Sequence, residues 1–161
     1  MTRAVYDTMV VFQWATLPPH QPQRQHATVT ALVNKSVLLC LSTELIVEVR
    51  NVLLRPELRE KYKTLTPEHV AAILSQARSF ADWFDDVPRH FSYPGHDKDD
   101  HILNLAIEAK AKYLVTWEKR LQKLSTDSSP VATAFRALAP DLSVVSPVDF
   151  SAMLKGREKQ S

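Results

Sequence analysis

Acidic side chains follow two short apolar runs that are typical of buried β-strands. Asp7 comes directly after the run Ala4-Val5-Tyr6, and Glu118 comes two residues after the run 113–116. Asp100 begins an apolar segment shortly before that second run. In an open parallel sheet, the carboxyl ends of the strands meet at one edge, where ligands bind. We therefore expect Asp7, Asp100 and Glu118 to lie close together.

A fourth carboxylate, Glu48, is predicted from helical spacing. At 100° per residue, one face of the segment 43–54 is apolar, and it is made of Leu45, Ile46, Val49, Val52 and Leu53. Glu48 falls at the edge of this face, where a carboxylate is half buried and needs a partner. That partner is either a metal ion or a cation on the same helix, Arg50 or Arg55.

Carboxylates gathered in this way suit hard divalent cations, because Mg²⁺ prefers oxygen ligands and often uses only a few of them. Such ions activate a water for attack on a phosphodiester and stabilise the leaving oxygen. Asp97 and Asp99 precede the helix that Asp100 begins, so a helix-capping role is an equal alternative for both.

Several other classes of site are excluded or disfavoured. The chain has only two glycines, so a Gly-rich phosphate loop and a GxGxxG dinucleotide site are excluded. A phosphatase of the haloacid dehalogenase type needs a second acid two residues after Asp7, where Met9 stands. His96 and His101 flank the acidic run, and loop or surface histidines are favoured there over a transition-metal site. The lone Cys40 cannot form an internal disulfide and lies in an apolar run, which favours a buried thiol.

Composition and charge are those of an ordinary globular protein. Of 161 residues, 45% are hydrophobic and 24% charged, with a formal net charge of +2 and a pI near 8.7. This weakly basic balance permits a nucleic-acid partner without requiring one. The N-terminus has neither a secretory signal nor a membrane span, so a cytoplasmic location is expected.

Short apolar runs alternate with longer amphipathic segments, which predicts an α/β fold with a parallel sheet covered on both faces. We expect a single domain over residues 1–155 and a polar C-terminal tail over 156–161. Strands are expected at 4–6, 37–41, 113–116 and 142–145. Helices are expected at 24–34, at 43–54, from Thr66 through an apolar stripe that includes Phe80 and Phe84, and at 100–110.

The chain resembles the PIN-domain family from about Arg3 to Leu154. Four stretches carry the resemblance: AVYDT at 4–8, STELIVEV at 42–49 with VLLRPEL at 52–58, DKDDHILNLA at 97–106 with YLVTWEKRL at 113–121, and VVSPVDF at 144–150. The second of these is similar to the acidic helix of the family with its Arg-Pro ending, and the third is the most specific.

This resemblance implies a three-layer α/β/α sandwich with a central parallel sheet, and an endoribonuclease that depends on Mg²⁺ or Mn²⁺. Within the family the chain resembles the VapC-like toxins of toxin–antitoxin pairs, which implies an antitoxin partner and often a homodimer. The implied catalytic and metal-binding residues are Asp7, Glu48, Asp100 and Glu118, with Asp99 as an additional metal ligand. The candidate substrate-binding residues are Thr8, Thr116, Lys119 and Arg120.

Two positions depart from the family pattern. Met9 stands where Asn or Ser is common, and Glu118 stands where Asp is common, so its carboxylate reaches about 1.5 Å further. An RNA-binding or interaction module with little nuclease activity is therefore the alternative function. Trp117, beside Glu118, is expected either to stack on a base or to pack against a neighbouring helix.

Overall fold

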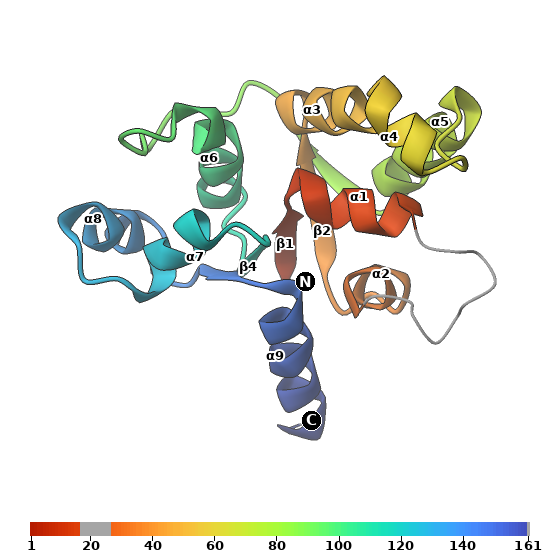
Figure 1. Cartoon of the computed structure of the whole chain (residues 1–161). Coiled ribbons are helices and arrows are strands. Elements are labelled where there is room, and N and C mark those ends of the chain that lie inside the picture. The colour runs from red at the N-terminus through yellow and green to blue at the C-terminus, as the bar shows by residue number, and fades with distance from the viewer. Residues whose placement is uncertain (17–26, 161) are drawn as a thin grey trace.

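A five-stranded parallel sheet forms the centre of the protein (Figure 1). This computed structural model describes residues 1–16 and 27–160. The strand order is β3-β2-β1-β4-β5. The strands are β1 (Arg3–Tyr6), β2 (Leu38–Ser42), β3 (Ala81–Phe84), β4 (Tyr113–Val115) and β5 (Ser143–Val145). The order reverses beside β1, because the chain leaves β1 towards β2 and later returns to its other side as β4. A ligand site is therefore expected at the carboxyl ends of β1 and the strands beside it.

Helices cover the sheet on both sides, which confirms the predicted three-layer α/β/α fold. The helices between β1 and β3 are α1 (Thr8–Thr16), α2 (Ala27–Val33), α3 (Thr43–Leu53), α4 (Pro56–Lys61) and α5 (Pro67–Ser79). Those after β3 are α6 (Asp100–Glu108), α7 (Lys119–Thr126), α8 (Pro130–Leu138) and α9 (Pro147–Gln160). Figure 1 shows α1, α3 and α5 on one side of the sheet and α6, α7 and α8 on the other. Each crossover between parallel strands thus returns over the face that right-handed connections require.

The middle of the sheet is apolar because both of its faces are covered. Val5, Leu39 and Leu114 are fully buried in the middle of the sheet. The predicted buried helix is also confirmed, since α6 contacts β1 and β2 and every residue from Ile102 to Ala106 is buried. Helix starts agree with their caps: the Ser42 side chain accepts a hydrogen bond from Leu45 N at the start of α3, and Thr66 accepts one from His69 N at the start of α5.

The structure corrects one expected element. The helical stripe was extended to Phe84, but α5 ends at Ser79 and residues 81–84 form β3, which pairs with β2. Spacing alone places Phe80 and Phe84 on one helix face, whereas pairing with β2 satisfies the backbone of this short segment in the sheet. Local periodicity cannot detect this competition, because the partner strand is about forty residues away in the sequence.

Other differences concern the ends and the short helices. Helix α1, which begins directly after Asp7, was not expected, and neither were α4, α7 and α8. Residues 156–160, expected as a polar tail, continue α9. Of the helix expected at 24–34, residues 24–26 lie outside the described part, and α2 accounts for 27–33. In the described ranges, no helix is long and apolar enough to span a membrane.

Candidate active site

Asp7 lies at the carboxyl end of β1, and hydrogen bonds fix both of its carboxylate oxygens. Its Oδ1 accepts a hydrogen bond from Thr8 N at 2.7 Å, and its Oδ2 accepts one from Thr116 Oγ1 at 2.7 Å. Burial raises the pKa of Asp7 above its usual value, although these two hydrogen bonds act against the shift. The negative charges of Glu48 and Asp99 raise the pKa further. Asp7 is therefore a rigid carboxylate within the electrostatic reach of two others.

Glu48 is held towards Asp7 from α3. Its Oε2 accepts a hydrogen bond from Thr8 Oγ1 at 2.7 Å and lies 3.3 Å from His101 Nε2. The hydrogen bond with His101 holds the pKa of Glu48 below its usual value, despite partial burial. Burial acts to lower the pKa of His101, but the hydrogen bond and the charge of Glu48 raise it overall. The half-buried carboxylate predicted from the helical wheel thus has partners on α1 and α6.

Arg120, near the start of α7, binds two of the candidate acids at once. Its Nε and Nη2 donate to the two carboxylate oxygens of Asp99 at 2.7 and 3.1 Å, and its Nη1 donates to Glu118 Oε2 at 2.6 Å. Hydrogen bonds to Asp99 raise the pKa of Arg120, which keeps the guanidinium charged. Asp99 and Glu118 therefore share one cation of the protein itself, Arg120.

Asp100 is buried and turned towards the loop that precedes α6. Its Oδ1 accepts a hydrogen bond from Tyr93 N at 2.8 Å, and only 6% of the residue is exposed. Asn104, one turn later, bonds the same loop through His90 N, Phe91 N and Phe91 O. Asp99 ends the 3-10 turn 97–99 and Asp100 begins α6. Their side chains therefore have different partners: Asp99 bonds Arg120, and Asp100 bonds the loop at Tyr93. Asp99 is the acid of this pair whose charge acts on Asp7.

The two candidate threonines are buried and hydrogen-bonded to the acids. Thr8 is 7% exposed and Thr116 is fully buried. Thr8 Oγ1 donates to Glu48, and Thr116 Oγ1 donates to Asp7 while it accepts from Glu118 N at 3.0 Å. Their hydroxyls join the carboxyl ends of β1 and β4 and the face of α3. Lys119, by contrast, is exposed.

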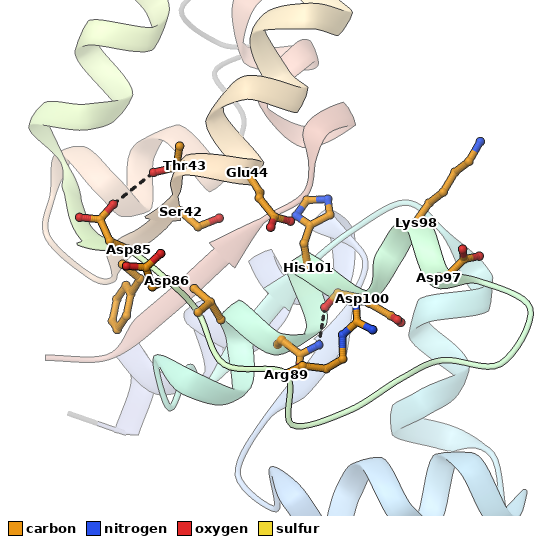
Figure 2. Close-up of a pocket in the computed structure, with 13 residues that line it drawn as sticks. Ser42, Thr43, Glu44, Asp85, Asp86, Arg89, Asp97, Lys98, Asp100 and His101 are labelled. Carbon is orange, nitrogen blue, oxygen red and sulfur yellow. Dashed lines mark hydrogen bonds between the residues drawn. The ribbon is translucent and has the colours of Figure 1, made fainter.

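A cavity of about 840 Å³ lies between the start of α3, the start of α6 and the loop after β3, and Asp100 is the one candidate acid that lines it. Figure 2 shows His101 beside Glu44 and close to Asp100, with Asp85 and Asp86 across the cavity. Thr43 Oγ1 donates to Asp85 at 3.1 Å on the far wall. Arg89 and Lys98 supply positive charge at its rim (Figure 2). The cavity is thus an open hollow lined by charges of both signs, with His101, the partner of Glu48, in its wall.

By type, these oxygen donors fit a hard divalent cation. The charges of Glu48 and Asp99 both act unfavourably on ionised Asp7, and a cation beside Asp7 would relieve that repulsion. In the state that the structure shows, however, no group of three or more His, Cys, Asp or Glu side chains within residues 1–16 and 27–160 is arranged to hold a metal ion. One physical reason for this arrangement is that Arg120 binds Asp99 and Glu118. Either carboxylate must be released from Arg120 before it can bind a metal ion.

Sequence reasoning missed two features of this site. It treated His101 as a loop or surface histidine, whereas His101 contacts Glu48 and its Nδ1 is buried without a hydrogen-bond partner among the described residues. It also assigned Arg120 to substrate rather than to Asp99. Arg120 lies two residues after Glu118 in the sequence, which was an available signal for an ion pair between them. Whether the Arg120 side chain points towards Asp99 and Glu118 depends, however, on how α7 packs.

The model of the PIN domain matches residues 3–120, and the chain belongs to the PIN-domain family. The matched range includes β1, α3, α6 and β4, and therefore all five candidate acids. Proteins of this family are commonly nucleases, and they typically use divalent metal ions. No match was found among curated proteins or among solved structures.

Proposed function

We propose that this protein is a metal-dependent endoribonuclease that hydrolyses RNA phosphodiester bonds. The observation that carries the proposal is Asp7, held rigidly at the end of β1 within the electrostatic reach of Glu48 and Asp99, in a chain of the PIN-domain family. When bound, a Mg²⁺ or Mn²⁺ ion would supply an activated water and charge stabilisation at the phosphodiester.

The residues of the chain take distinct parts in this proposal. Asp7, Glu48 and Asp99 are the proposed metal ligands, because the charges of Glu48 and Asp99 both act on Asp7. Thr8 and Thr116 are positioning residues, since Thr8 donates a hydrogen bond to Glu48 and Thr116 donates one to Asp7. Glu118 joins the ligands only when it is released from Arg120. Asp100 is proposed to hold the loop at Tyr93 rather than to touch the metal.

The test is cleavage of a fluorogenic RNA panel with Mn²⁺, with and without a chelator. We expect Asp7→Ala and Asp99→Asn to lower the rate at least about a hundredfold, on the scale of losing one charge-stabilising group. Asp100→Asn, the matched neighbour, should lower stability and retain more activity than Asp99→Asn. Cleavage that is undiminished in Asp7→Ala would come from a contaminating nuclease, and it would refute the proposal.

The alternative is a non-catalytic RNA-binding module. It is favoured by one observation, the ion pairs that tie Asp99 and Glu118 to Arg120. Binding of RNA by the wild type without cleavage in Mn²⁺ would support this alternative. We further propose that the protein is the toxin of a toxin–antitoxin pair, on the resemblance to VapC-like chains. Growth arrest on expression, relieved by Asp7→Ala and by a protein encoded next to this chain, is the expected result.

A further inference from the structure

Trp117 lies between two residues of the candidate site, and its ring is open to solvent. Thr116, before it, bonds Asp7, and Glu118, after it, bonds Arg120. Trp117 is 40% exposed, whereas Trp14 is 9% exposed and Trp83 is partly buried. An indole is among the most expensive side chains to leave in water, because it carries a large apolar area. Its exposure at the edge of the site therefore calls for an explanation.

The indole is fixed in place rather than left free to turn. Its Nε1 donates a hydrogen bond to Gln13 Oε1 at 2.6 Å. Gln13 is on α1, the helix that begins directly after Asp7, so the contact joins the segment after β4 to α1. Trp117 thus combines features of the two roles expected for it. Its ring is anchored to a neighbouring helix, and part of its surface remains exposed for stacking on a base.

The surroundings of Trp117 suit a nucleotide. Met9, which is 41% exposed, precedes Gln13 by one helical turn and lies on the same face of α1. The exposed Lys119, two residues after Trp117 in the chain, adds a positive charge to this segment. An apolar aromatic surface with a cation nearby is the combination that binds an unpaired base together with its phosphate.

We propose that Trp117 is a stacking platform for one unpaired nucleobase next to the cleaved bond. This inference rests on the proposed function and assigns it a substrate-binding residue. A base in a duplex is already stacked between its neighbours and cannot present its face to an indole without leaving the helix. In a single strand, a base exposes its face with little loss of stacking energy.

The experiment measures binding of a short single-stranded RNA and of its duplex in Ca²⁺ with Asp7→Asn as the background, so that cleavage does not interfere. Tryptophan fluorescence should be quenched by the single strand. Trp117→Phe should remove most of this quenching while affinity falls little, because phenylalanine still stacks. Trp117→Leu keeps apolar bulk without an aromatic face, and it should weaken binding of the single strand by about tenfold or more. Trp83→Phe, on β3, is the matched control and should retain both affinity and quenching.

Equal affinity of the Leu and Phe variants for single-stranded RNA would overturn the proposal, as would equal losses for the duplex. Quenching that disappears in Trp83→Phe instead would place the RNA on another surface. Affinity for RNA that is unchanged in Trp117→Leu, with loss of a protein partner, would assign this surface to protein binding and also refute the inference. These outcomes are independent of the nuclease assay: Trp117-dependent binding without cleavage by the wild type in Mn²⁺ would refute the proposed catalysis alone.

Discussion

Removal of Arg120 should strengthen metal binding. The guanidinium makes two contacts to Asp99 and one to Glu118, at 2.6–3.1 Å, and all three must be given up before these carboxylates can bind an ion. The perturbation is Arg120→Gln, which removes the charge and keeps a polar side chain of moderate length. The backbone carbonyl of residue 120, which accepts a hydrogen bond from Tyr93, is unaffected.

The size of the effect follows from the exposure of the ion pairs. The Arg120 side chain is 39% exposed, so its ion pairs are screened by water and are each worth about 1 kcal/mol at most. Loss of both pairs costs an incoming cation about 1–2 kcal/mol. Since 1.4 kcal/mol corresponds to a factor of ten in affinity, the Kd for Mn²⁺ should fall roughly tenfold in Arg120→Gln.

The assay is calorimetric titration with Mn²⁺, with thermal unfolding at each metal concentration as a second readout. Lys119→Gln removes the same formal charge from an exposed neighbour and is the matched control for long-range electrostatics. Arg120→Lys keeps the charge but loses the two-pronged contact with Asp99, so it should fall between the wild type and Arg120→Gln. Affinity in Arg120→Gln that is equal to or weaker than in Lys119→Gln would refute the competition between Arg120 and the metal.

Three further predictions concern the folded state. Because the pKa of Asp7 is raised in the fold, ionisation of Asp7 destabilises the protein, and Asp7→Asn should raise the melting temperature at pH 7 in chelator. The gain should vanish as the pH falls below the ordinary pKa of 3.8, where Asp7 becomes protonated in both states, and a gain that is independent of pH would contradict this. Asn104→Ala should cost about 3 kcal/mol in urea unfolding, since it leaves buried loop groups unpaired, whereas a cost no greater than that of the exposed Asn51→Ala would contradict it. Burial raises the pKa of Cys40 to about 12, so a thiol reagent at pH 8 should label Cys40 only at the rate of unfolding, and rapid labelling of the folded protein would show that the strand opens.

Much of the fold was predictable because local patterns and topology agreed. The short apolar runs around Val5, Leu39 and Leu114 are typical of strands buried on both faces, and parallel strands require crossover connections, usually helices. The order of strands and helices along the chain then placed Asp7 and Glu118 near one edge of the sheet. Strand β3 was not predictable in this way, because a four-residue segment takes its conformation from β2 rather than from its own periodicity.

The sequence by itself determined the chemistry available to this protein: a fold of the PIN-domain family and carboxylates at the carboxyl ends of its strands. The tertiary structure alone decided how these charges are paired. The turn before α6 separates the environments of Asp99 and Asp100, although the two are adjacent in the chain and equal in charge. The packing of α7 brings Arg120 into contact with Asp99 and Glu118, and the packing of α6 against α3 brings His101 into contact with Glu48. Each of these pairings depends on side-chain directions within a few ångströms, because charge interactions and hydrogen bonds fall off over that distance, and the spacing of residues along a chain does not specify directions at that scale.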